Sequence, residues 1–345
     1  MSNAQPVNDR ITPKQWKPLV APFTKTHLGK EIWQLTNSLG AYVLLWVTMY
    51  FTLAVSWWLT AAVAILAGAF LVRVFIIFHD CGHGSYFRSK TARSIWGFVC
   101  GMATFTAYGQ WTWEHAHHHA NSGNLDERGI GDIWTMTVEE YRHASLWERL
   151  GYRAVRNPII LFVIGPLLHF TFQHRIPNSS GNSKLKRSVW FMNFALAAKV
   201  IVLMSIFGVL PYLFIQVICM AVGASIGTWL FYVQHQHDDA YWEKKEDWDF
   251  TDAALKGSSF YKLPRVMQWF SGNIGFHHVH HLSSRIPNYN LEACHNALSI
   301  FNQVKPITLL PSLKTMSYRL WCEADKTLVG WSYLKQSIRA QSSQN

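Results

Sequence analysis

The amino-acid sequence predicts an all-α integral membrane protein whose four transmembrane helices form two hairpins. In this chain of 345 residues, half of them hydrophobic, the stretches 38–72 and 200–234 contain no Asp, Glu, Lys or Arg. Each stretch is close to twice the roughly 20 apolar residues that cross a bilayer. The turns expected within them carry no basic residue, whereas Lys and Arg flank them, as is typical of cytoplasmic segments. A pair of buried helices in a soluble protein is the alternative, but uncharged runs of this length are rare there.

The first hairpin is expected to start near Ile32 and to turn near residues 56–58. Before it, residues 1–30 are polar and lack the short apolar core and small-residue cleavage site of a removable signal peptide, so they are expected to be a cytoplasmic tail. After it come two shorter apolar stretches, 95–108 and 158–172. Both are too short to span comfortably, so we expect them to be interfacial or re-entrant.

The second hairpin is expected to start near Ser188 and to turn near residues 207–211. Lys199 is a charged residue close to the apolar run of its first helix. It is expected either to snorkel towards the interface or to mark a later start of that helix.

One domain with polar ends is the simplest organisation, because no repeat or Pro-rich linker is evident. We expect a cytoplasmic N-terminal tail (1–30), a membrane domain (31–300) and a cytoplasmic C-terminal segment (301–345). Since each hairpin returns to the side it entered, both termini are expected in the cytoplasm.

The net charge of +11 is assigned to a membrane surface rather than to nucleic acid, because the basic residues flank apolar runs. The five cysteines are scattered and odd in number. They indicate neither a disulfide framework nor a Cys-based metal site.

Ten of the 17 histidines lie in three short segments: His79-Asp80-Cys81-Gly82-His83, His115-Ala116-His117-His118-His119 and His277-His278-Val279-His280-His281. In a helix, residues i, i+3 and i+4 share one face, so each H-x-x-H-H triad is expected to aim three imidazoles at one point. The first segment offers a pair at i and i+4. The predicted ligands are His79, His83, His115, His118, His119, His277, His280 and His281.

Eight imidazoles exceed what one four- to six-coordinate ion uses, so two metal ions are predicted. A structural zinc site needs only four ligands, often Cys, and an all-His site with open positions suits redox iron better. His235 or His237, at the end of the fourth helix, is expected to complete the site. If the helix continues through both, at most one of them faces the metals.

The remaining polar residues near the three segments are candidates for supporting roles. His117 and His278 are expected to point away from the metals. Asp80 and Asp132 are candidates to accept the outer N–H of a ligating ring. His143 and His174 lie outside the segments and are expected to be dispensable.

The three segments resemble the histidine boxes of the membrane fatty acid desaturase family, H-x(3,4)-H, H-x(2,3)-H-H and H-x(2,3)-H-H. The resemblance covers roughly residues 35–300, and Gly-Asn-Ile-Gly-Phe-His-His-Val-His-His looks like bacterial and plant-type acyl-lipid desaturases of the delta-12 and delta-5 kind. It implies a mushroom-like helical fold with a cytoplasmic helical cap that holds a di-iron site.

The resemblance also implies His235 as the additional ligand at the end of the fourth helix. Several family members have an Asn four residues before that histidine, which holds a metal-bound water, and here the position is Phe231. Asn273, four residues before His277, is a candidate substitute.

The implied activity is that of an O2-dependent fatty acid desaturase, which places a cis double bond in an acyl chain that is expected to be lipid-linked. Two iron ions are the implied cofactors, and O2 is the co-substrate. The chain has neither a haem motif of a fused cytochrome nor a dinucleotide-binding glycine motif, so an external electron donor such as ferredoxin is expected.

Two alternatives stay open from the sequence. An acyl or carotenoid hydroxylase uses the same scaffold. A histidine-rich membrane metal transporter would instead need ionisable residues along an ion path inside the apolar runs, which have none apart from Lys199 at one edge.

Overall fold

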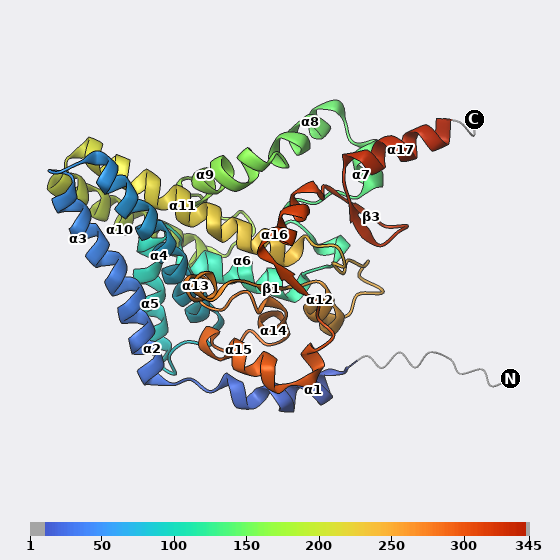
Figure 1. Ribbon diagram of the computed structural model, residues 1–345, viewed down its shortest axis with the longest axis horizontal. Helices are drawn as coiled ribbons and strands as arrows, with labels where there is room; N and C mark the ends of the chain where they lie inside the picture. Colours follow the sequence, from blue (N-terminus) through green and yellow to red (C-terminus); the bar gives the residue numbers. More distant parts are fainter. Residues whose placement is uncertain (1–10, 343–345) are drawn as a thin grey trace.

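Among the described residues, three helices are long and apolar enough to cross a membrane: α4 (Trp57–His83), α10 (Ser183–Phe207) and α11 (Val209–His235). They belong to a computed structural model that describes residues 11–342, and side chains as far as residue 336. Figure 1 shows the long helices gathered at one end of the molecule, with shorter elements covering the other. The predicted hairpins therefore correspond to three such helices plus the segment before α4.

That segment consists of α2 (Leu28–Leu35), a short π-helix η2 (Thr36–Gly40) and α3 (Ala41–Thr52). The three pieces follow one another without a non-helical residue and form one rod along the left edge of Figure 1. Each piece alone is shorter than a span, although the whole rod has the length of one. A single π turn inside a helix is a common local irregularity.

Both hairpin turns lie close to their predicted positions. α3 ends at Thr52, and the Ser56 side chain caps α4 by accepting hydrogen bonds from the Trp58 and Leu59 amides. Gly208, with φ 84°, separates α10 from α11, a backbone conformation that glycine adopts without strain. The two turns are neighbours, since the Trp57 and Phe214 ring centroids lie 4.9 Å apart.

The hairpins begin about one turn earlier than predicted, at Leu28 rather than near Ile32 and at Ser183 rather than near Ser188. At the second start, the Asn182 side chain accepts hydrogen bonds from the Lys184 and Leu185 amides. A capped polar turn thus precedes the apolar run.

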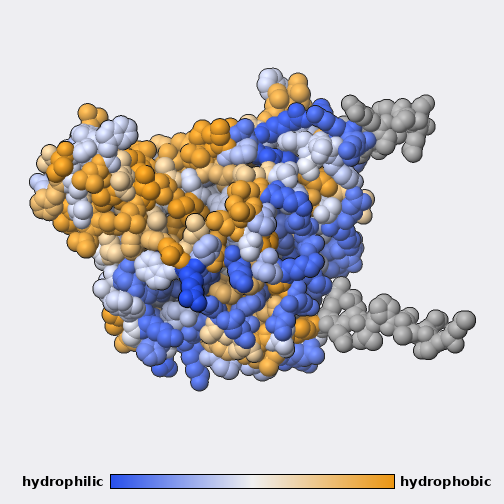
Figure 2. Space-filling view, in the orientation of Figure 1, coloured by the Kyte–Doolittle hydropathy of each residue, from blue (hydrophilic) through white to orange (hydrophobic). Residues whose placement is uncertain are grey.

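Helix α4 is central, because it packs against α3, α11 and α5 (Lys90–Ala103). Buried residues of this core include Met49, Ala64, Ala67, Ile77 and Cys219. The outer faces of the long helices stay apolar: Phe51, Trp58, Phe194 and Leu210 are all more than 60% exposed. Figure 2 shows this hydrophobic surface over the long helices and a hydrophilic surface over the opposite end. A lipid environment explains the exposed band.

The stretch 95–108 covers most of α5 and the turn that leads into α6 (Tyr108–Asn121). α5 ends at Ala103, the chain turns through Phe105 at φ 55°, and α6 runs back. The expectations for Lys199 were wrong on both counts. It sits well inside α10, and its Nζ points inward to the Met102 carbonyl, 2.7 Å away at the end of α5, because that end offers a free acceptor in the interior.

The stretch 158–172 is bent rather than straight. α8 (Leu146–Val155) meets the segment formed by η4 (Ile160–Ile164), α9 (Gly165–Thr171) and η5 (Gln173–Arg175) at 65°. Arg156 and Asn157 separate the two helical pieces, and Pro158, which follows them, has no amide hydrogen to continue the first helix.

The other end of the molecule carries the shorter elements. They are α1 (Pro13–Val20), η1 (Ala21–Thr24), η3 (Leu125–Glu127), α7 (Val138–His143), α12 (Phe250–Lys256), α13 (Arg265–Phe270), α14 (His277–Leu282), α15 (Asn288–Ala297), η6 (Ser299–Phe301), α16 (Leu309–Ser312), η7 (Leu313–Ser317) and α17 (Trp331–Ser342).

The all-α prediction needs a small correction, because four three-residue strands are present. β1 (Phe260–Lys262) pairs in parallel with β2 (Pro306–Thr308), and β3 (Leu320–Cys322) pairs antiparallel with β4 (Thr327–Val329). Strands this short leave no period-two pattern in the sequence.

Both predicted polar ends contribute to the core as far as they are described. Trp16 and Val20 of the N-terminal segment are buried, as are Phe301 and Trp321 of the C-terminal segment. Residues 1–10 and 343–345 of the predicted tails lie outside the described residues.

Candidate metal centre

Four helices deliver histidines to one region of the interior. α4 ends with His79 and His83, where Gly84 at φ 73° stops the helix, and α11 ends with His235. α6 carries His115, His118 and His119, and the one-and-a-half-turn helix α14 carries His277, His280 and His281.

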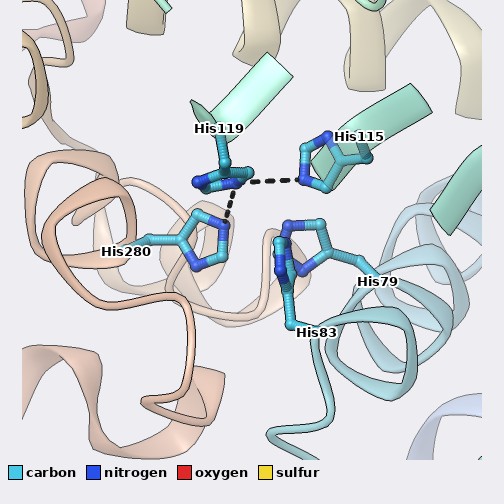
Figure 3. A group of neighbouring side chains, drawn as sticks. All are labelled: His79, His83, His115, His119 and His280. Atoms are coloured by element: carbon cyan, nitrogen blue, oxygen red, sulfur yellow. Dashed lines mark hydrogen bonds between the residues drawn. The ribbon is translucent and has the colours of Figure 1, made fainter. Parts of the chain in front are cut away.

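These nine side chains form two clusters, within each of which one nitrogen per ring lies within 4.8 Å of the others. The first cluster is His79, His83, His115, His119 and His280, and the second is His118, His235, His277 and His281. Figure 3 shows the five rings of the first cluster converging from three helices. The clusters are adjacent, since the His119 and His281 rings stack with centroids 4.1 Å apart.

The two H-x-x-H-H triads do not each aim at one point, contrary to the prediction. In α6, His115 and His119 join the first cluster while His118 joins the second. In α14 the partition is reversed, with His277 and His281 in the second cluster and His280 in the first. On a helix, residue i+4 is offset from i by about 40°, but i+3 is offset by about 60° in the other direction. Each triad therefore bridges two neighbouring sites.

The spacing of the ring nitrogens fits metal coordination. His115 and His119 Nε2 are 3.2 Å apart, and His119 and His280 Nε2 are 3.0 Å apart. In the second cluster, His235 Nε2 lies 2.9 Å from His277 Nε2 and 3.2 Å from His118 Nε2. Two nitrogens at right angles around an ion, with metal–nitrogen bonds of roughly 2.1 Å, would be about 3.0 Å apart. No Cys, Asp or Glu of the described residues joins either cluster.

Five of the nine rings are held in the neutral form that binds metals. Burial, and then neighbouring imidazoles, lower the pKa of His115, His119, His277, His280 and His281 well below the ordinary histidine value. Nε2 of His83, in the first cluster, and Nε2 of His281, in the second, are buried without a hydrogen-bond partner, a cost that a bound cation would reduce. The donor set therefore suits a pair of imidazole-preferring metal ions.

Two carboxylates contact ligand rings directly. Asp132 Oδ1 lies 2.6 Å from His118 Nδ1, and Asp80 Oδ1 lies 3.0 Å from His79 Nδ1. A carboxylate on the outer nitrogen sets the ring's tautomer and orientation, which leaves the inner nitrogen free to bind.

At the end of α11, the structure distinguishes the two candidates. His235 belongs to the second cluster, whereas His237 belongs to neither. The helix ends at His235, and Gln236 leaves it at φ −119° and ψ 72°, so the assumption of a helix through both residues does not hold. Burial lowers the pKa of His237 to about 4, and this ring remains a neutral part of the surrounding wall.

The other supporting candidates lie away from both clusters. His117 is next to Asn121 one turn along α6, and His278 Nε2 lies 2.9 Å from His295 Nδ1. Asn273, at φ 61°, donates its side-chain amide hydrogen to the Asn288 carbonyl at 3.3 Å.

Three residues make contacts at the site that the sequence did not predict. Asn288 donates from its backbone and side-chain amides to Asp80 Oδ2, at 2.7 and 2.8 Å. The Trp111 ring stacks on His115 at 4.4 Å. Phe231, considered only as a replaced Asn, packs its ring 4.9 Å from His235 and 5.1 Å from His118. No sequence pattern points to Asn288. Trp111 could have been predicted, because it lies four residues before His115, on the same helical face.

Comparison with known proteins identifies the family. The model of the family described as "Fatty acid desaturase" matches residues 56–301. A fatty acid desaturase of Bacillus subtilis is 43% identical over 322 residues, which cover 93% of this chain and 92% of that protein. From a Synechocystis species, an sn-1 oleoyl-lipid 12-desaturase is 25% identical (70% and 69% covered), and an sn-1 acyl-lipid omega-3 desaturase (ferredoxin) is 27% identical (70% and 68% covered). The chain belongs to the fatty acid desaturase family.

Proposed function

We propose that this chain is a membrane-embedded acyl-lipid desaturase that inserts a cis double bond into a lipid-linked fatty acyl chain. The observation that carries the proposal is the pair of all-histidine clusters, one buried and one partly buried, at one end of a lipid-facing helix bundle. The overall reaction converts CH2–CH2, O2, two electrons and two protons into CH=CH and two waters.

The residues proposed to hold two iron ions are the nine clustered histidines, five around one ion and four around the other. When bound, the irons would supply activation of O2 and removal of two hydrogens from unactivated methylenes. The chain itself supplies the imidazoles and the carboxylates of Asp132 and Asp80, which orient two of the rings. Burial of the second cluster limits the access of bulk water to that part of the site.

The chain is proposed to cross the membrane four times, with the rod α2–η2–α3 as the first span, and with its clusters and both termini in the cytoplasm. Supporting this, the two hairpin turns are neighbours, while the clusters lie at the opposite ends of α4 and α11. The bent segment after α8 is proposed to be re-entrant.

The electron donor is proposed to be an acidic external protein such as a ferredoxin. A cavity of about 550 Å³ opens beside the first cluster, and its lining includes His83 and three basic residues, Lys90, Arg93 and Arg285. Within the part of the chain that the structure describes, no acidic residue lines it. Complementary charge would steer an acidic donor to this edge of the metal centre. One of the Synechocystis relatives is an sn-1 acyl-lipid omega-3 desaturase (ferredoxin), and its name agrees with this class of donor.

Lipid analysis tests the proposed reaction. The chain would be expressed with a ferredoxin system in a host that lacks unsaturation at the candidate positions, and fatty acid derivatives would be separated by gas chromatography and identified by mass spectrometry. We expect new cis-unsaturated acyl chains in the lipid fraction, and none with the His281→Ala variant. Hydroxylated chains would instead favour the hydroxylase alternative, and an unchanged profile would contradict both.

A further inference from the structure

A second cavity, separate from the histidine clusters, lies between the start of the first helical rod and the middle of α4. Its volume is about 220 Å³, and no clustered histidine lines it. The lining residues that matter here are Lys30, Trp33, Asn37, Arg73, Trp269 and Asn273.

Arg73 is the unusual residue of this cavity, because it is a buried cation without a carboxylate partner. The residue is only 6% exposed, and its guanidinium carbon lies 3.7 Å from the centroid of the Trp269 ring. It donates to the Trp269 carbonyl and, at 3.4 Å, to Asn37 Oδ1, while its Nε is buried without a partner. No acidic side chain of the described residues lines the cavity. A buried charge is costly unless it is paired, so this environment lacks an anion.

A second cation stands at the same cavity. Lys30 is exposed, with its Nζ 5.3 Å from the centroid of the Tyr289 ring, and no ion pair joins it to a described acidic residue. Two tryptophans accompany the cations: Trp33 is 68% exposed and Trp269 is 40% exposed. Indole rings beside basic groups are typical of the membrane interface.

The depth of the cavity agrees with that interface. Arg73 is roughly 24 Å along α4 from Trp57 at the hairpin turn, and Trp33 is about 28 Å from Thr52 along the first rod. The hydrocarbon core of a bilayer is about 30 Å thick. The cavity therefore falls near the headgroups of the leaflet on the histidine side.

We infer that this cavity binds the phosphate of a glycerophospholipid headgroup, with Arg73 and Lys30 neutralising its charge and the Asn37 and Asn273 amides lining its polar surroundings. Paired with two cations, a phosphodiester would relieve the desolvation cost of Arg73. The inference rests on the proposed function and deepens it, because it specifies the lipid class to which the acyl chain is attached.

One wall of the cavity continues into the metal centre. Asn288, which lines the cavity, donates its side-chain amide to Gln34 Oε1 at 3.1 Å and to Asp80 Oδ2 at 2.8 Å. The same Asp80 contacts His79 at 3.0 Å. A phospholipid held by its phosphate in this cavity is thus anchored beside the first cluster, where a substrate must be.

Binding measurements test the inference directly. The iron-loaded full-length protein would be immobilised and titrated with radiolabelled dipalmitoylphosphatidylglycerol or dipalmitoylglycerol in mixed detergent micelles. The two lipids share their acyl chains and differ in the phosphate headgroup. We expect the phospholipid to bind at least tenfold more tightly, a difference of about 1.4 kcal/mol.

The variants Arg73→Gln and Lys30→Gln should each lose about tenfold in affinity for the phospholipid and leave diacylglycerol binding unchanged. Lys184→Gln, at an exposed basic position in the first turn of α10, is the matched control and should bind both lipids as the wild type does. If Arg73→Gln fails to fold, Lys30→Gln carries the test, because Lys30 is exposed.

Three outcomes would overturn the inference: equal affinity of the wild type for both lipids, unchanged phospholipid affinity in Lys30→Gln, or displacement of the lipid by an equal concentration of inorganic phosphate, which would indicate a site for free anions. A desaturation assay on the same samples separates the two proposals. Headgroup-dependent binding without any unsaturated product would retain the site and contradict the proposed function, whereas desaturation without headgroup dependence would do the reverse.

Discussion

Individual histidines differ in what they contribute, although they occupy the same three sequence segments. Eight of them, together with His235, form the two clusters. His117 and His278 lie outside the clusters, where they contact Asn121 and His295, respectively. Exposure separates the remaining histidines further. The His143 side chain is 77% exposed, but His174 is buried against His169, so His143 is the appropriate control for substitutions.

Removing a clustered ring should abolish desaturation. We expect His83→Ala, His118→Ala and His281→Ala to lose more activity than the roughly 100-fold that loss of an outer hydrogen-bond partner costs, because each removes a direct donor to the metal site. His143→Ala should retain wild-type activity. Activity would be measured in membranes, after immunoblotting has shown equal insertion, and comparable losses in both groups would contradict the assignment.

The end of α11 offers a sharper comparison between two histidines two residues apart. His235→Ala should lose iron and activity together, because His235 Nε2 lies within 3.2 Å of two other ring nitrogens. His237→Ala should keep its iron and some activity, since His237 joins neither cluster. Iron per chain, measured by elemental analysis on both purified variants, decides the matter, and the opposite ranking would place the ligand on His237.

Asp132 should matter through the ring that it holds. Asp132→Asn replaces the carboxylate 2.6 Å from His118 Nδ1 and is expected to lower activity or metal affinity by about 10- to 100-fold. Asp126→Asn is the control, because Asp126 accepts from the Lys245 backbone amide at the surface. Steady-state rates and iron retention during dialysis against a chelator would be compared, and equal behaviour of the two variants would argue against an orienting role.

The helices that carry these residues are held in register by close backbone approach. Where α4 meets α11, a Cβ on Gly68 would lie 2.6 Å from Val222 Cβ, and one on Gly223 would lie 3.1 Å from the Gly68 carbonyl. Small residues let membrane helices approach each other in this way. Because α4 ends at His83 and α11 ends at His235, this contact also sets the separation of their histidines.

Gly68→Ala should therefore destabilise the bundle by about 1–3 kcal/mol, the usual cost of overpacking. Gly227→Ala provides a matched control in α11, since a Cβ there would meet no atom within 4 Å. Thermal unfolding of both purified variants in the same detergent measures the difference. A Gly68→Ala variant that unfolds at the temperature of the Gly227→Ala variant would show that the helices can separate at no cost.

At the level of the whole molecule, the two histidine clusters form where the ends of two long apolar helices meet shorter helices. α4 and α11 supply His79, His83 and His235, and α6 and α14 complete both clusters. Since α6 and α14 each serve both clusters, neither cluster is complete without contributions from distant parts of the chain.

Two clusters in one chain predict about two irons per polypeptide. Protein purified without added zinc should contain this amount by elemental analysis, and the His235→Ala variant should contain less, as its second cluster keeps three histidines. Chelation should lower the unfolding temperature, because a ligand bound only to the folded state stabilises it. One zinc and no iron would falsify the di-iron proposal.

The sequence by itself determined the helical membrane class, the approximate hairpin turns and eight of the nine clustered histidines, whereas residue spacing left His235 and His237 as alternatives for the ninth. Each of these depends on local patterns: uncharged runs as long as a bilayer and imidazoles repeated at helical spacing. Similar local reasoning identified Asp80 and Asp132 as candidate partners of ligand rings.

Only the tertiary structure decided how the histidines are divided between two sites. The partition of each triad depends on how α6 and α14 are rotated between α4 and α11, and no local pattern encodes that rotation. The inward path of Lys199, the contact of Asn288 with Asp80 and the three-residue strands likewise join segments far apart in the chain. Such contacts are set by packing of the complete chain, because spatial proximity between distant residues leaves no periodicity in a single sequence.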